Sequence, residues 1–152
     1  MAESADVVLA YWSEHRQQLR QSESQRAVLT NYVLLITTAV SGFVVQQNFR
    51  PSTVALSLFI IVIGIYGAIS AAKYHERAEY HLSQARSLTR ALVALGALGD
   101  HAGALEATRE VHRTNYPRLS RLRLHKLWTG LHLAIAAYGV VLTIITLLLA
   151  AR

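Results

Sequence analysis

The sequence predicts an all-α integral membrane protein with three transmembrane helices and a cytoplasmic helical bundle built from extensions of those helices. Residues 27–49, 51–72 and 127–151 are uncharged stretches of 23, 22 and 25 residues. About 20 helical residues cross the roughly 30 Å of hydrocarbon in a bilayer. Only 16% of the 152 residues are charged, so a soluble chain would have too little polar sequence to cover three such helices.

We expect a single membrane domain over residues 1–152, organised around a hairpin of two antiparallel spans. The predicted segments are a cytoplasmic helix at 5–26, a first span at 27–46, a second span at 53–72, a cytoplasmic helical region at 73–126 and a third span at 127–151. The link between the first two spans is short and polar, and Pro51 stands where the second helix would begin. Proline is favoured there because the first N–H groups of a helix have no helical partner.

The cytoplasmic extensions are predicted to pack on each other through faces marked by Trp12, Leu19, Leu82 and Leu88, which recur at helical spacing. Three glycines between residues 96 and 103 predict a turn. A shorter helix at about 104–115 should then end before Pro117, because the residue before proline disfavours helical geometry. We expect the chain to be helical again from Arg118 into the third span.

Charge fixes the predicted orientation. Three Lys or Arg residues precede the first span and ten lie between the second and third spans, which leaves two of the 15 elsewhere. Basic residues gather on the cytoplasmic side of membrane proteins. We therefore expect a multi-pass protein of the cell inner membrane, with the N-terminus and residues 73–126 cytoplasmic and the C-terminus outside. The acidic start is followed by no apolar core segment, so no signal peptide is expected.

The residues favour no enzymatic chemistry. The chain has no cysteine, no paired carboxylates within the spans and no glycine-rich phosphate loop, so we expect no catalytic residue, cofactor or metal. His75 and Glu79 are four residues apart and could present two metal ligands on one helix face. Such motifs normally need a second pair, and a solvated helix face is the alternative interpretation.

Arginine and tyrosine side chains in the predicted cytoplasmic region suit an anionic nucleotide or oligonucleotide. Guanidinium groups bind phosphate, and aromatic rings stack on bases. The candidate ligand-binding residues are Arg77, Arg86, Arg90, Arg109, Arg113, Arg118, Arg121, Tyr74, Tyr80 and Tyr116. The alternative is that these basic residues only set the topology and contact anionic lipid headgroups.

Polar and small residues form stripes at three-and-four spacing within the spans. The candidate pore-lining residues are Asn31, Thr38 and Ser41 in the first span and His132, Thr143 and Thr146 in the third. Hydroxyls and amides on such stripes either hydrogen-bond across helices or face water. Two interpretations therefore stay open: close packing within one chain, or a pore on the axis of a homo-oligomer, for which a tetramer is our starting guess.

His125 and His132 lie seven residues apart near the predicted cytoplasmic mouth of the third span. Protonation of either imidazole between about pH 5 and 8 would change the charge at that mouth. Helix capping or contact with lipid headgroups is the alternative role for this pair.

The order of elements resembles a known family. A helix with Tyr11, Trp12 and Arg16 precedes a two-span hairpin, and the hairpin is followed by a basic helix that begins around 71–82. Over roughly residues 8–95 this is similar to the small SLATT-type membrane effectors, which are associated with nucleotide second messengers in prokaryotic antiviral defence and are regarded as pore formers. The third span goes beyond a two-span pattern, and no functional residue is carried over from the family.

Two functions are expected from these features. The first is a homo-oligomeric pore or ion channel, gated when an anionic nucleotide or oligonucleotide, or a cytoplasmic regulatory protein, engages the basic helices. The second is a non-conducting membrane adaptor whose basic helices dock a cytoplasmic partner or anionic lipid.

Overall fold

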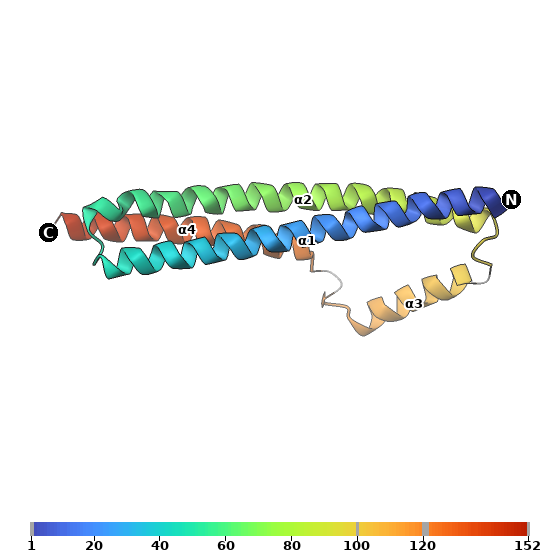
Figure 1. Ribbon diagram of the computed structural model, residues 1–152. Helices are drawn as coiled ribbons and strands as arrows, with labels where there is room; N and C mark the ends of the chain where they lie inside the picture. The colour runs from blue at the N-terminus through green and yellow to red at the C-terminus, as the bar shows by residue number, and fades with distance from the viewer. Residues whose placement is uncertain (1, 100, 120–121, 152) are drawn as a thin grey trace. The chain divides into compact units, whose positions relative to one another are not determined.

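The computed structural model describes residues 2–99, 101–119 and 122–151 and is helical throughout, apart from turns and short links (Figure 1). The helices are α1 (Ala2–Gln46), the short 3-10 helix η1 (Pro51–Thr53), α2 (Val54–Ala94), α3 (His101–Asn115) and α4 (Leu124–Ala150). The described residues contain no strand. The prediction of an all-α fold is confirmed.

The link between α1 and α2 reverses the chain in a few residues. Asn48 and Phe49 both have positive φ, at 49° and 54°, and the Phe49 N–H donates to the Val44 carbonyl at the end of α1 over 3.2 Å. This left-handed arrangement satisfies a carbonyl that has no helical partner. Arg50 is the N-cap of η1 and Pro51 is its first residue, so proline occupies the helix start that its missing N–H favours.

The second half of the chain departs from the prediction at one point. Gly96 ends α2 with φ of 70°, and the Ala97 N–H donates to the Leu92 carbonyl, as the glycine-rich turn predicts. The helix predicted from Arg118 is wrong, because residues 117–118 form a turn and α4 begins only at Leu124. Leu119 and Leu122 are 64% and 60% exposed, so an earlier helix start would gain no buried apolar contact.

The contacts divide the chain into two units, and α1 and α2 contribute residues to both. Unit 1 comprises residues 1–23 and 76–124, and unit 2 comprises residues 24–75 and 125–152. In unit 1, Ala78, Ala85 and Leu92 of α2 are buried, and the Trp12 indole N–H donates to the Thr89 hydroxyl oxygen over 3.0 Å. The two extensions predicted at residues 5–26 and 73–95 therefore contact each other within unit 1, whereas Tyr11 is 63% exposed.

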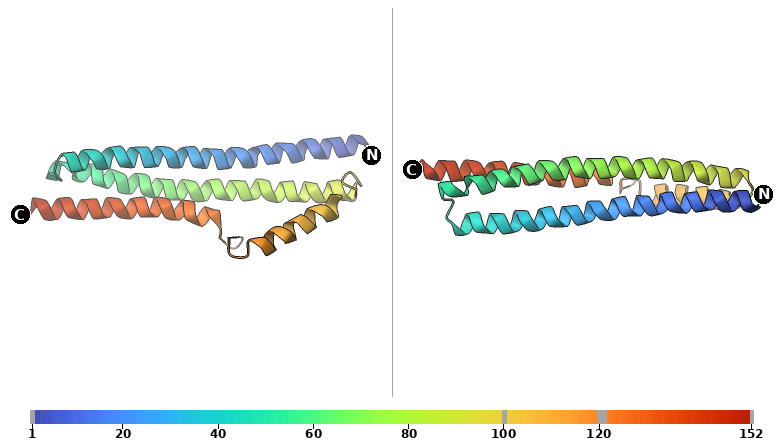
Figure 2. Two further views of the ribbon diagram at one scale, coloured as in Figure 1. Left: turned by 90° about the horizontal axis from the view of Figure 1, so that it is seen from below. Right: turned by 45° about the horizontal axis from the view of Figure 1, so that its top comes forward.

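Unit 2 is a three-helix bundle of α1, α2 and α4, which lie side by side in both views of Figure 2. Its core contains Val33 from α1, Ile60 from α2, and Ile135 and Leu142 from α4. Glycines bring α2 and α4 unusually close together. A Cβ atom added at Gly64 would lie 2.6 Å from the Ala136 backbone nitrogen, and one at Gly139 would lie 2.9 Å from the Ile61 nitrogen.

The outward faces of unit 2 are apolar. Leu35, Val62, Ile69 and Leu148 are each more than 60% exposed, whereas exposed apolar surface is normally scattered on a soluble protein. Among the described residues, three helices are long and apolar enough to cross a membrane: Glu3–Gln46, Pro51–Ala94 and Leu124–Ala150. The structure therefore agrees with the three apolar spans predicted from the sequence.

The close contact of α2 with α4 predicts that Gly64→Ala destabilises the protein. The new methyl group meets backbone atoms of Ala136, which cannot move aside as a side-chain end can, so we expect a loss of about 1–3 kcal/mol. Thermal unfolding of the detergent-solubilised protein measures the loss. The matched control is Gly130→Ala on α4, where a Cβ atom meets nothing within 4 Å. Equal unfolding midpoints for the two variants would contradict this packing.

Candidate functional site

Two regions contain the predicted site residues: a basic groove in unit 1 and the polar side chains of unit 2. The groove has a volume of about 590 Å³ and is formed by α1, α2 and α3. Its lining residues are Trp12, Arg16, Leu82, Ala85, Arg86, Thr89, Leu105, Thr108, Arg109 and His112. A neighbouring hollow of about 420 Å³ shares Arg86, Thr89 and Arg109 with it and adds Ser83 and Arg90.

Two of the predicted ligand residues, Arg86 and Arg109, therefore line this groove, and a third, Arg90, lines the hollow beside it. Two further lining residues, Trp12 and Arg16, are not among the predicted ligand residues. They lie four residues apart on α1, with the Arg16 guanidinium 5.7 Å from the Trp12 ring centroid. Their spacing on one helix face was the available signal. The groove combines guanidinium groups, hydroxyls and an indole, which suits a ligand with phosphate and an aromatic or apolar part.

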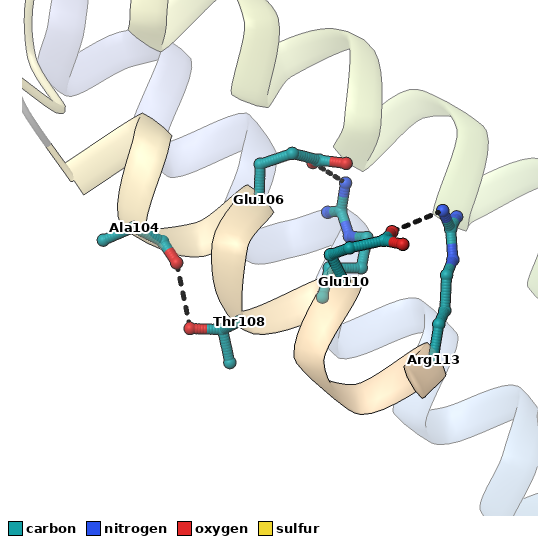
Figure 3. Close-up of polar contacts among 6 residues, drawn as sticks. Ala104, Glu106, Thr108, Glu110 and Arg113 are labelled. Carbon is teal, nitrogen blue, oxygen red and sulfur yellow. Dashed lines mark hydrogen bonds and ion pairs between the residues drawn. The ribbon is translucent and has the colours of Figure 1, made fainter. Parts of the chain in front are cut away.

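Helix α3 supplies Arg109 together with its own acidic partners. The Arg109 guanidinium contacts the Glu106 carboxylate at 2.6 Å, and Arg113 contacts Glu110 at 3.6 Å (Figure 3). These pairs are more than 60% exposed at every side chain, so each is weak and an incoming phosphate competes readily with it. No residue of α3, which is described along its whole length, is buried.

The other predicted ligand residues lie outside the groove. Arg77 donates to the Gln18 side-chain oxygen in unit 1, Tyr80 packs edge-on against His81, and Tyr116 lies beside His112 with ring centroids 5.2 Å apart. Tyr74 belongs to unit 2, where it lines a small hollow of about 240 Å³ with Ser70 and Lys73.

Two further arginines of the predicted set are not in the groove. Arg118 is exposed in the turn after Pro117, and Arg121 lies outside the described residues.

The predicted pore residues of unit 2 separate into two groups. His132 and Thr146 of α4 are fully buried within the bundle, and Thr143 is half-buried. Asn31 and Thr38 of α1 are exposed, with Ser41 half-buried. The α4 stripe is thus largely a packing face within one chain, whereas the α1 stripe points outward.

His132 takes part in a buried polar contact that the sequence did not reveal. Its Nε2 atom lies 3.1 Å from the Thr30 hydroxyl oxygen, and that hydroxyl donates to the Arg26 carbonyl over 3.0 Å. With the hydroxyl proton directed to that carbonyl, the compatible tautomer of His132 is the one that donates from Nε2. The ring rests on Gly67, where an added Cβ atom would lie 2.2 Å from Nδ1.

Arg26 is the one unexpected charge within this bundle. It is only 6% exposed, and its guanidinium lies 5.3 Å from the centroid of the Trp128 ring. The Arg26 Nε–H and the Trp128 indole N–H are buried donors without a protein acceptor. Buried arginine is rare because removing a charge from water is costly, which marks this position as a candidate site.

His125 does not approach His132 as a pair; it stacks on His75 instead. The His75 and His125 ring centroids are 3.8 Å apart and the rings are nearly parallel, at 10°. This contact joins α2 to α4 within unit 2 and gives His75 a role other than metal binding with Glu79.

A second pair of histidines connects α1 to α2 within unit 1. The Nδ1 atoms of His15 and His81 are 3.0 Å apart, so one ring donates and the other accepts, and at least one must be neutral. Burial lowers the pKa of His81 below its usual 6.5, His15 and Arg77 lower it further, and Glu14 acts in the opposite direction.

A scan of protein-family models, a search of curated proteins and a search of solved structures each found no match to this chain.

The lowered pKa of His81 predicts that unit 1 loses stability in acid. The folded chain favours the neutral form of His81. The resulting contribution to the free energy of unfolding is therefore complete above about pH 6.5. It declines at lower pH, where the unfolded chain binds a proton more readily than the folded chain does. The unfolding midpoint, followed by Trp12 emission in a Trp128→Phe background, should fall between about pH 7.5 and 5.5. His81→Gln should reduce that fall, whereas His101→Gln, at the exposed start of α3, should leave it unchanged.

Proposed function

We propose that this protein is a homo-oligomeric membrane pore, an ion-channel effector that responds to an anionic nucleotide or oligonucleotide through its basic groove. In this proposal unit 2 crosses the cell inner membrane and unit 1 lies in the cytoplasm, as the distribution of basic residues indicates. The similarity in element order to SLATT-type effectors supports the same function and a place in antiviral defence.

The observation that carries the pore is the outward direction of Asn31 and Thr38 on α1. Both lie within the 23-residue uncharged stretch and both are exposed on the single chain. The Thr38 hydroxyl donates to the Leu34 carbonyl. An amide such as that of Asn31 has no such partner within its own helix, so it is unfavourable where it faces hydrocarbon. Several copies arranged with this face on a common axis would give Asn31 both partners and water.

The burial of His132 and Thr146 restricts which stripe lines the path. A pore-lining side chain must reach water, and these two reach other helices of the same chain. We therefore assign the path to Asn31, Thr38 and Ser41 of α1, with Thr143 of α4 as a half-buried neighbour.

Gating is proposed through the groove of unit 1. Arg16, Arg86 and Arg109 come from three different helices, so a phosphate-bearing ligand that contacts all three would fix the positions of those helices. Two of them, α1 and α2, also supply residues to unit 2. Binding energy that favours one arrangement of these helices would shift the population of open pores.

The basic groove equally favours the second candidate, a non-conducting adaptor. A groove of about 590 Å³ with three arginines would dock an acidic segment of a cytoplasmic regulatory protein by the same charge-assisted hydrogen bonds. Flux measurements on the purified protein separate the two functions.

The pore predicts that the double variant Asn31→Leu with Thr38→Leu loses ion flux. Ions passing an apolar lining lose hydration, and a rise of 1.4 kcal/mol in the barrier already lowers flux about tenfold. Flux is measured in liposomes that contain the purified protein. Val62→Leu with Ile69→Leu is the matched control, since both side chains point outward from α2. Unchanged flux in the first variant would remove α1 from the path.

The groove predicts that Arg86→Gln and Arg109→Gln each weaken binding of ATP or a short labelled oligoribonucleotide. Loss of one charge-assisted hydrogen bond costs about 1.5–3 kcal/mol, or tenfold and more in affinity. Equilibrium binding to the detergent-solubilised protein gives the change. Arg20→Gln is the control, because Arg20 is an exposed arginine of unit 1 that does not line the groove. Equal losses in all three variants would indicate nonspecific charge attraction.

A further inference from the structure

The chain that leads from α3 into α4 contains a run of basic residues interleaved with leucines, and neither the groove nor the proposed path uses it. We call residues 118–127 the juxtamembrane segment. Its described part is residues 118–119 and 122–127. The basic residues and leucines are Arg118, Leu119, Arg121, Leu122, Arg123, Leu124, Lys126 and Leu127. No carboxylate follows Glu110 in the sequence, so the basic residues of this segment have no acidic neighbour along the chain.

The leucines of the juxtamembrane segment are turned to the surroundings. The exposed fractions of Leu119, Leu122, Leu124 and Leu127 lie between 58% and 64%. Single exposed leucines are ordinary, but four within ten residues are a concentration of apolar surface that is unfavourable in water. An apolar phase beside this segment would remove all four from water.

The cations of the segment are exposed and have no carboxylate partner. Arg118, Arg123 and Lys126 are exposed, and among the described residues no ion pair involves any of the three. The arginines of α3 differ, because Arg109 and Arg113 each contact a glutamate one turn earlier. Topology alone would explain cations at this point of the chain, but it does not require leucines between them.

The covalent chain keeps this segment at the end of the third span. Helix α4 is continuous from Leu124 into the uncharged stretch that begins at Leu127, and at 1.5 Å per residue Leu124 precedes that stretch by only about 5 Å. Trp128 is of the residue type that lies at the level of lipid headgroups. Even in a fully extended chain, Leu119 is at most roughly 18 Å from Leu124.

We propose that the juxtamembrane segment binds anionic phospholipids of the cytoplasmic leaflet. Its cations would contact headgroup phosphates, and its leucines would enter the boundary between headgroups and acyl chains. Four or more Lys and Arg residues beside a membrane helix attract anionic lipid, and each contributes about fivefold in affinity. A soluble nucleotide would meet the same cations but would leave the leucines in water. The proposal rests on the membrane placement of unit 2 in the proposed function, and not on the pore.

The test measures which lipids lie beside the segment in the full-length protein. The chain has no cysteine, so Leu122→Cys accepts a single bimane label. The labelled protein is reconstituted in liposomes of phosphatidylcholine and phosphatidylglycerol, and a nitroxide that quenches bimane is placed on one lipid or the other. We expect nitroxide on phosphatidylglycerol to quench about fivefold more strongly, and high salt to reduce the difference.

The control label is placed at Gln17→Cys, an exposed position of α1 ten residues before the first uncharged stretch. It should be quenched weakly by both lipids. Equal, strong quenching of the Leu122→Cys label by the two lipids overturns the preference for anionic lipid. Quenching of that label as weak as at Gln17→Cys overturns contact with the membrane altogether.

Variants assign the preference to the cations of the segment. Arg118→Gln with Arg123→Gln should lower the preference for phosphatidylglycerol about fivefold or more. The charge-matched control is Arg86→Gln with Arg90→Gln. These two residues lie more than a dozen positions beyond Lys73 on α2, roughly 20 Å along the helix and farther than a Debye length. Equal losses in both double variants overturn the assignment to this segment.

Ion flux measured in the same liposomes separates this proposal from the pore. Intact preference for phosphatidylglycerol without flux, in the presence and absence of ATP or oligoribonucleotide, overturns the pore and supports the lipid contact. Flux without any lipid preference overturns the lipid contact and leaves the pore standing.

Discussion

The close approach of α2 to α4 is the constraint on which the rest of unit 2 depends. Gly64 and Gly139 remove the side chains that would hold the two backbones apart, and van der Waals packing of this kind drives association of apolar helices when lipid is the solvent. Gly67 then leaves room for the His132 ring, whose Nε2–H reaches Thr30 on α1. The glycines of α2 and α4 therefore position all three helices, because α1 is joined to α2 and α4 through His132, for which Gly67 leaves room.

The packing of the three helices also decides which polar stripe faces a neighbouring helix and which faces outward. A helix in a three-membered bundle has one face toward its neighbours and another toward the surroundings, so a polar stripe can serve only one of them. On α4 the stripe with His132, Gly139 and Thr146 is the neighbour face. On α1 the neighbour face contains Thr30, Val33, Thr37 and Val44, which leaves the stripe through Asn31 and Thr38 outside. Sequence periodicity finds both stripes but cannot tell which of them meets another helix.

More of the fold than of the candidate site could be predicted from the sequence, and the reason is physical. Uncharged length, the proline at the start of η1 and the glycines after Ala94 are local signals, and each predicted its element. The helix predicted from Arg118 failed because its leucines have periodicity but no partner, and periodicity carries no information about partners. The groove required Trp12 and Arg16 to meet Arg86 and Arg109 across three helices, and the burial of Arg26 required α4 to return beside α1. Such long-range contacts are not encoded in any short stretch of residues.

The charge balance of unit 1 decides how an anionic ligand could be recognised there. In unit 1 the arginines of α3 are accompanied by Glu106 and Glu110 in exposed pairs, so the region is nearly balanced and a phosphate gains affinity only where several guanidinium groups converge. Affinity then depends on geometry, which is what a ligand-controlled switch requires. Recognition of an anionic ligand would thus depend on the convergence of Arg16, Arg86 and Arg109 in the groove, and not on the net charge of unit 1.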